Sequence, residues 1–134
     1  MTSIVKIEGI GGVYAPKLQA ARCATVESLL KRGATPRGRM ELAQECGISE
    51  KLLLEWVNHA DLWRIKGVGE EYSDLLEEAG VDTVVELAQR RPENLYAKMV
   101  EVNGQKKLVR RLPTQGQVAD WISQAKALPR MVSY

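Results

Sequence analysis

Apolar residues recur along the chain at spacings of three and four, which is the period of amphipathic helices. Alternation with a period of two, the mark of a half-buried strand, is not convincing in any part of the sequence. The pattern predicts an all-α fold with about four short helices in each half of the chain.

Prolines, polar caps and glycines indicate where these helices begin and end. Pro36 and Pro92 suit first-turn positions, and Ser49 is a candidate N-cap for a helix over 50–62. The other signals are a capping-box pattern before the last helix and four candidate stops: Thr114 with Gln117, and Gly33, Gly47, Gly80 and Gly104.

The chain contains a diverged internal repeat. A shift of 58 residues aligns Ile7–Gly11 with Ile65–Gly69, and both segments read apolar-x-Gly-apolar-Gly. Identical residues continue at this shift: Tyr14 and Tyr72, Leu18 and Leu76, Ala21 and Ala79, Thr25 and Thr83, Val26 and Val84, and Leu29 and Leu87. We expect one domain over 1–134, with a first repeat over 4–62 and a second over 63–128.

The Gly-x-Gly turns have the chemistry of a phosphate site. Glycine lets the backbone reverse tightly and approach a ligand closely. The helix that follows offers its first free N–H groups and its positive dipole end, which suit a phosphate oxygen. The apolar residues of each turn are expected to anchor it in the core: Ile7 and Ile10 in the first, Ile65 and Val68 in the second.

Residues 7–21 and 65–79 resemble helix-hairpin-helix motifs. That resemblance implies sequence-independent contact with DNA, through backbone amides on phosphate. Nearly the whole chain also resembles the bacterial Domain of Unknown Function 4332 family, notably at residues 52–58, 67–72 and 106–111. This second resemblance implies no particular activity.

A helix-hairpin-helix needs a helix before its turn, and only six residues precede Ile7. Residues 120–125 match 55–60 at a shift of 65, which makes the helix over 115–128 the equivalent of the helix over 50–62. We expect the helix over 115–128 to cover the first turn and close the halves into one compact pseudo-two-fold helical domain. The same contact between chains would give a domain-swapped dimer.

The net charge of +2 is distributed unevenly. Residues 64–86 hold two basic and seven acidic side chains, hence −5, whereas residues 87–134 hold nine basic and three acidic, hence +6. The change of shift from 58 to 65 places seven extra residues in the second repeat, within 102–111. This insertion carries a basic cluster that suits phosphates but could also be a solvated helix face.

The two turns differ in their charged neighbours, and this difference selects the candidate site. Lysines flank the first turn, whereas acidic residues follow the second and satisfy the helix dipole there. Gly67 and Gly69 are therefore expected to be structural. The nucleic-acid-binding candidates are Lys6, Gly9, Gly11, Gly12, Lys17, Lys106, Lys107, Arg110 and Arg111.

The sequence predicts a non-catalytic protein that contacts the phosphate backbone of DNA or RNA. Six neutralised phosphates would give a salt slope of about −5 in log affinity against log salt. The alternative is a protein-interaction or scaffold module without a nucleic-acid role, whose acidic surface over 70–86 suits a basic protein. Either could be a monomer or a domain-swapped dimer.

Three other patterns each have a packing interpretation and a functional one. Residues 42–56 fit a helix-turn-helix, but their second helix offers leucines and acids where base readers need Arg, Asn or Gln. The tryptophans could stack on bases. The apolar neighbours of Trp56 and Trp121 favour a position in the core, whereas for Trp63 both a core position and an exposed one remain possible. Cys23 and Cys46 are expected to be buried thiols, with a disulfide or redox role as the alternative.

Catalytic and membrane signals are weak. No triad, metal cluster or phosphate-binding loop with its lysine is visible, and we expect His59 on a helix surface. We therefore predict no enzymatic activity, no cofactor and no metal. No apolar run approaches the roughly 20 residues that span a bilayer, and residues 1–10 do not read as a signal segment, so the expected compartment is the cytoplasm.

Overall fold

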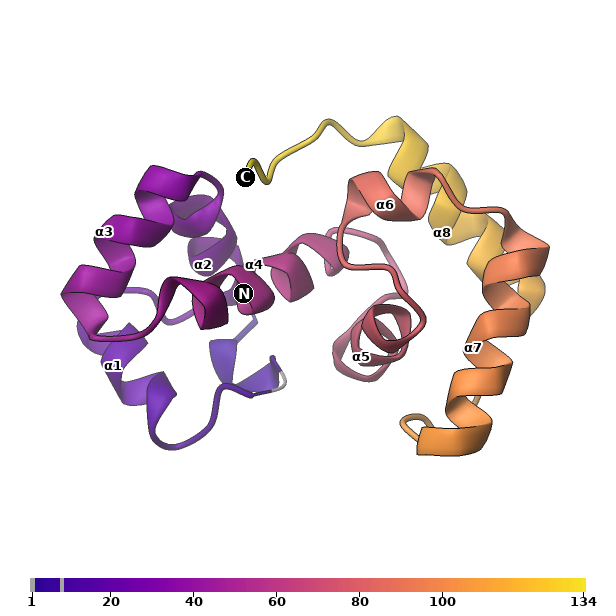
Figure 1. The fold of residues 1–134 in the computed structure, drawn as a ribbon, viewed down its shortest axis with the longest axis horizontal. Coiled ribbons are helices and arrows are strands. Elements are labelled where there is room, and N and C mark those ends of the chain that lie inside the picture. The colour runs from indigo at the N-terminus through magenta and orange to yellow at the C-terminus, as the bar shows by residue number, and fades with distance from the viewer. Residues whose placement is uncertain (1, 8) are drawn as a thin grey trace. The chain divides into compact units, whose positions relative to one another are not determined.

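The computed structural model describes residues 2–7 and 9–134, so Glu8 of the first turn lies outside the described residues. Within these residues the fold is all-α, as predicted, with eight α-helices, one 3-10 helix and no strand beyond an isolated bridge between Ser3 and Thr25 (Figure 1). The elements are η1 (Ile4–Lys6), α1 (Tyr14–Ala20), α2 (Val26–Gly33), α3 (Pro36–Cys46), α4 (Glu50–Leu62), α5 (Glu70–Glu78), α6 (Val84–Ala88), α7 (Pro92–Lys106) and α8 (Gln115–Ala127).

Most of the predicted helix ends are confirmed. Pro36 and Pro92 occupy first-turn positions of α3 and α7, and the Ser49 hydroxyl accepts a hydrogen bond from the Leu52 N–H at the start of α4. Thr114 and Gln117 form the expected capping box of α8. Stops are confirmed at Gly33, which ends α2, at Gly47, and at Gly80, the last two in left-handed conformations.

Gly104 does not end its helix, so that prediction is wrong. Helix α7 continues to Lys106, and Lys107 adopts the left-handed C-cap conformation with φ of 51°. The side chain of Asn103 explains the later stop, because its amide makes two hydrogen bonds with the backbone of Val109. These bonds turn the chain back after α7 without help from glycine.

The chain forms two compact units. Unit 1 comprises the residues up to Asp61 together with Met131–Tyr134, and unit 2 comprises Leu62–Arg130. Each unit contains four of the α-helices, α1–α4 in unit 1 and α5–α8 in unit 2. In unit 1, α2 packs against α3, and in unit 2, α8 packs against α6 and α7 (Figure 1).

Corresponding residues of the two units make the same local hydrogen bonds. The Cys23 N–H donates to the Leu18 carbonyl, and at a shift of 58 the Val81 N–H donates to the Leu76 carbonyl, both at 2.8 Å. Thr25 caps α2 and Thr83 caps α6, each through its side-chain oxygen. The repeat seen in the sequence is therefore also a repeat of backbone structure.

Each unit covers its own turn, which corrects the expectation for the last helix. Trp56 of α4 packs against Gly9 in unit 1, and Trp121 of α8 packs against Gly67 in unit 2. Helix α8 contributes Trp121 to the core of unit 2.

Candidate nucleic-acid interface

The first glycine of each turn is required by the packing. Gly9 has φ of +93° and Gly67 has φ of +97°, values that side-chain-bearing residues rarely adopt. A Cβ on Gly9 would lie 3.1 Å from Nε1 of Trp56, and a Cβ on Gly67 would lie 3.0 Å from Nε1 of Trp121. Both glycines thus accommodate an indole ring, and neither is free for a ligand on that side.

The apolar residues of both turns are anchors, as predicted. Ile7, Ile10, Ile65 and Val68 are all buried. The Ile10 N–H donates to the Ile7 carbonyl and the Val68 N–H donates to the Ile65 carbonyl, each at 3.1 Å. The two turns are therefore closed by the same hydrogen bond.

The second glycine of each turn borders open space. A Cβ on Gly11 or Gly69 would meet no heavy atom of the described residues within 4 Å, and the same holds for Gly12. The carbonyls of Gly11 and Gly69 accept hydrogen bonds from Ala15 and Ser73, the first bonds of the following helices. These glycines leave room for a close ligand at the start of α1 and of α5.

Exposed cations flank the first turn. Lys6 ends η1, and Lys17 lies on α1 with its Nζ 6.0 Å from the centroid of the Tyr14 ring. Tyr14 in turn packs on Trp56, with 5.1 Å between ring centroids. Unit 1 thus holds Lys6, Gly9, Gly11, Gly12 and Lys17 around one turn.

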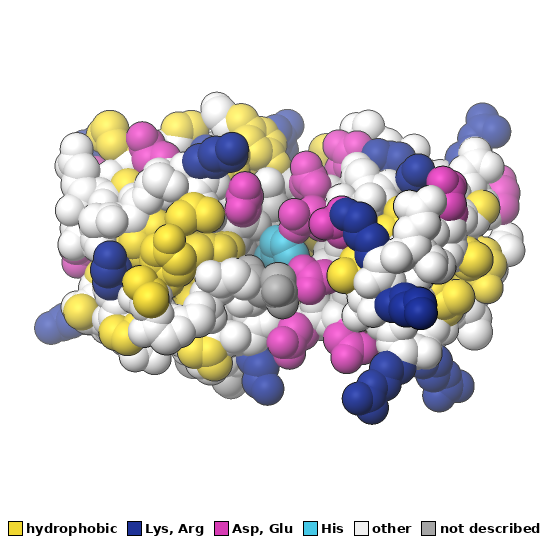
Figure 2. Space-filling model, turned by 60° about the horizontal axis from the view of Figure 1, so that its bottom comes forward, with side chains coloured by type: hydrophobic (Ala, Val, Ile, Leu, Met, Phe, Trp, Pro, Cys, Tyr) yellow, Lys and Arg dark blue, Asp and Glu magenta, His cyan; other side chains and the backbone are white. Residues whose placement is uncertain are grey.

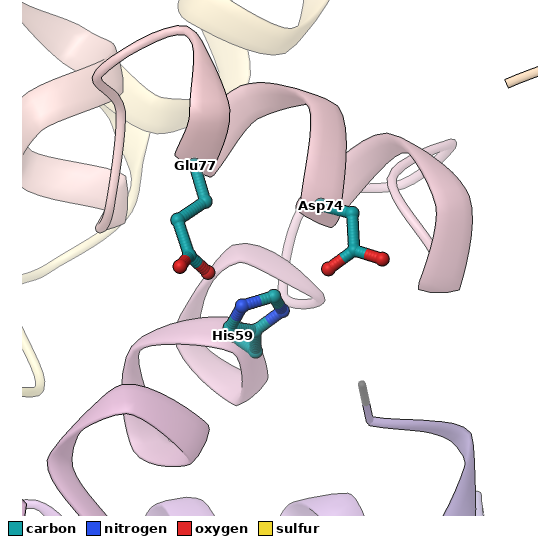
Figure 3. A group of neighbouring side chains, drawn as sticks. All are labelled: His59, Asp74 and Glu77. Carbon is teal, nitrogen blue, oxygen red and sulfur yellow. The ribbon is translucent and has the colours of Figure 1, made fainter. Parts of the chain in front are cut away.

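Carboxylates follow the second turn. Glu70 and Glu71 lie in the first turn of α5. Asp74 and Glu77 lie on one side of the same helix (Figure 3). Their negative charge opposes a phosphate at the N-terminus of α5, as the sequence indicated.

The basic insertion belongs to unit 2, where its residues up to Lys106 lie in α7 and the following residues form a loop held by hydrogen bonds. The side-chain oxygen of Asn103 accepts from the Val109 N–H at 2.9 Å, and its amide nitrogen donates to the Val109 carbonyl at 3.2 Å. The Tyr72 hydroxyl donates to the Arg111 carbonyl at 2.9 Å, which ties the loop to α5. Asn103 and the Tyr72 hydroxyl were not singled out from the sequence, although their positions beside the insertion and the second turn were visible there.

The cations of the insertion differ in their partners. Lys106 forms an ion pair with Glu78, with 2.6 Å between Nζ and Oε2. Lys107, Arg110 and Arg111 are exposed on the loop. On the face drawn in Figure 2, acidic and basic side chains are interspersed.

The structure therefore separates the candidates into two groups. The first-turn group lies in unit 1, and the group of Lys106, Lys107, Arg110 and Arg111 lies in unit 2 beside α5. A Cβ on Gly67 would meet Trp121, whereas a Cβ on Gly69 would enter open space.

The packing alternatives are confirmed for two tryptophans and both cysteines. Trp56 and Trp121 are each 2% exposed, which leaves no free ring face for a base. Trp63 is half-buried, and its Nε1 donates to the Ser73 hydroxyl at 3.0 Å. Cys23 and Cys46 are free buried thiols, and burial is the main cause that raises the pKa of each.

Helix α4 is a core helix. Leu53 and Trp56 of the candidate recognition helix are buried, which supports the packing interpretation over a helix-turn-helix. His59 is 5% exposed, so the expectation of a surface histidine is wrong. The other residues at the end of α4, Ala60, Asp61 and Leu62, are buried as well.

Comparisons with known proteins give a family. The model of the family described as Domain of unknown function (DUF4332) matches residues 8–128, which include all but Ile7 of the first turn, the whole second turn and the eight α-helices described above. A search of curated proteins and a search of solved structures gave no match. Among the described residues, no helix is long and apolar enough to cross a membrane.

Proposed function

We propose, from the premise that the chain belongs to the Domain of unknown function (DUF4332) family, that it is a non-catalytic nucleic-acid-binding protein. It consists of tandem helix-hairpin-helix repeats and contacts the phosphate backbone largely without regard to sequence. The ordered basic loop after α7 carries this proposal. Its contacts with Asn103 and Tyr72 fix the backbone and leave Lys107, Arg110 and Arg111 exposed.

The order of this loop favours binding because an ordered segment loses less conformational entropy when it meets a ligand. Arginine side chains match phosphate in a planar, two-point geometry, and lysine contributes a point charge. None of these groups reads base edges, so affinity follows phosphate density and salt concentration.

The first turn supplies a second contact. Gly11 and Gly12 leave space for a phosphate oxygen at the start of α1, where Lys6 and Lys17 add positive charge. The second turn has a structural role and does not bind phosphate, because Glu70 and Glu71 repel an anion there. The function is thus divided between one turn in unit 1 and one loop in unit 2.

A salt titration of variants tests the proposal. Binding to random duplex DNA, single-stranded DNA and RNA is measured by fluorescence anisotropy for the wild type and for Lys107→Ala/Arg110→Ala/Arg111→Ala. Each lost phosphate contact on duplex DNA should reduce the salt slope by about 0.9, so this variant should lose about 2.7. The double variant Lys6→Ala/Lys17→Ala should lose about 1.8.

A matched control removes the same charge elsewhere. Lys31→Ala/Arg37→Ala/Lys126→Ala also deletes three exposed cations, and the expected slope is that of the wild type. An equal loss in the control and the loop variant would refute a defined interface. Absence of binding to all three nucleic acids at low salt would refute the proposal itself.

A protein-interaction or scaffold role is the second candidate, favoured by the acidic helix α5. Its exposed or half-exposed carboxylates include Glu70, Glu71, Asp74 and Glu77, which suit a basic protein. This role predicts binding to a cationic peptide such as oligolysine that is weakened by Glu70→Gln/Glu71→Gln, without salt-dependent binding to nucleic acid.

A further inference from the structure

The last four residues of the chain pack in unit 1, although the chain reaches them from unit 2. Helix α8 ends at Ala127, and the segment that follows has no helix (Figure 1). Arg64 holds the start of this segment in unit 2, because its Nη2 donates to the Pro129 carbonyl at 2.7 Å. Met131–Tyr134 then belong to unit 1.

Unit 1 contacts Ser133 through both polar groups of its backbone. The Ser133 N–H donates to the Ala34 carbonyl at 2.8 Å, and the Ser133 carbonyl accepts from Nη2 of Arg39, also at 2.8 Å. This two-sided pairing is the way in which extended peptides are recognised through the main chain.

Arg39 is built into the site. Its side chain is 5% exposed, and its other terminal nitrogen, Nη1, donates to the Gly33 carbonyl at 2.8 Å. Gly33 is held close to α4, since a Cβ there would lie 2.4 Å from Cγ2 of Val57. Burial is the main cause that lowers the pKa of Arg39, and such a buried cation needs carbonyl partners to be stable.

Side chains on both sides of Ser133 complete the contact. Val132 is 3% exposed and fills unit 1 as an apolar anchor. The Tyr134 hydroxyl donates to Oδ1 of Asn58 at 3.3 Å, and the Tyr134 ring centroid lies 6.0 Å from Cζ of Arg39. The tail is thus held by a buried side chain, by hydrogen bonds of its backbone and side chains, and by an aromatic contact with a cation.

We propose that unit 1 contains a binding site for an extended Val-Ser-Tyr segment, and that the chain's own C-terminal tail is the resident ligand and acts as a releasable latch. The segment after α8 forms no helix, so it exchanges between docked and released states while the helices stay folded.

The expected size of the effect follows from effective concentration. A short tether keeps the tail near the site at an effective concentration of about 1 mM. A free peptide that makes the contacts of Val132, Ser133 and Tyr134 should have a dissociation constant on the order of 10⁻⁴ M. The resident tail should therefore weaken the binding of a free peptide by about tenfold. A second copy of the chain replaces the tail only at comparable, millimolar concentrations.

The test measures binding of a labelled peptide of residues 128–134 to the full-length chain by fluorescence anisotropy. Ser133→Pro in the protein removes the N–H that bonds to Ala34, and it should release the tail and make the peptide bind about tenfold more tightly than to the wild type. Adding Arg39→Gln should abolish this binding, whereas adding Arg37→Gln, at an exposed position on the same helix, should leave it unchanged.

Two controls keep the result decisive. A peptide that itself carries Ser133→Pro should not bind, and circular dichroism of the Ser133→Pro and Arg39→Gln proteins checks that the helices are retained. Equal affinity of wild type and Ser133→Pro for the peptide would overturn the latch. Binding that persists in folded Arg39→Gln protein, or no binding to released protein up to millimolar peptide, would overturn the site.

Discussion

Replacing Gly67 with alanine tests the packing of the second turn. The φ of +97° lies in a region that costs a residue with a Cβ about 1 to 3 kcal/mol. The new Cβ would also lie 3.0 Å from Nε1 of Trp121, which must shift by a few tenths of an ångström within a core that is otherwise closely packed. Together these effects should lower the free energy of unfolding by about 2 to 4 kcal/mol.

Gly69 is the matched control, because it lies two residues away in the same turn. Its φ is −125°, and a Cβ there meets no described atom within 4 Å, so Gly69→Ala should change the free energy of unfolding by less than about 1 kcal/mol. Urea denaturation followed by tryptophan fluorescence measures both variants. A loss for Gly69→Ala as large as that for Gly67→Ala would refute this account of the turn.

Three further predictions concern the caps, the loop and the thiols. Thr25→Ala and Thr83→Ala should each lower the free energy of unfolding by about 1 kcal/mol in urea denaturation, since each threonine caps the equivalent helix of its repeat; no loss at either position would contradict the repeat of backbone structure. Asn103→Ala should cost about 2 kcal/mol and speed tryptic cleavage at Lys107, Arg110 and Arg111, because it removes both bonds to Val109; an unchanged cleavage rate would show that other contacts order the loop. The pKa values of Cys23 and Cys46 are raised in the folded chain, so the folded state retains protons that the unfolded state loses at high pH. The free energy of unfolding should therefore fall as the pH rises above 9.0. This fall should be smaller in Cys23→Ala/Cys46→Ala.

The sequence was sufficient for those features that depend on local chemistry. Proline, threonine and serine caps act within one helical turn, so the starts of α3, α4 and α8 could be predicted. The burial of Ile7 and Ile65 also followed from the repeat, because both positions kept an apolar residue while their neighbours changed.

The features that were mispredicted depend on contacts between distant residues. The exposed or buried state of His59 is decided by what surrounds the end of α4, which a helical pattern does not encode. Gly104 resembled a helix stop, but the side chain of Asn103 fixes the end of α7 through Val109, six residues further on. Likewise, the match of residues 120–125 with 55–60 favours a last helix that covers the first turn, whereas in the structure Trp56 and Trp121 each pack against the turn of their own unit.

The sequence predicted which residues are candidates for the site but not which contacts they make with one another. The sequence identified the cations of the insertion, whereas the pairing of Lys106 with Glu78 and the hydrogen bond from Tyr72 to Arg111 depend on how distant segments fold together. The role of Arg39 was missed, since a single arginine on α3 gives no sign that its partner is the carbonyl of Ser133.

The salt dependence of wild-type binding to a random DNA duplex is the most direct test of the proposed function. Lys106 is not counted as a phosphate contact because it pairs with Glu78. The other five candidate cations predict a slope of about −4 to −5 in log affinity against log salt; they are Lys6, Lys17, Lys107, Arg110 and Arg111. The dissociation constant at physiological salt should be roughly 10⁻⁴ to 10⁻⁶ M, with little change between unrelated sequences. A slope near zero, or no binding at low salt, would contradict phosphate-backbone recognition by this protein.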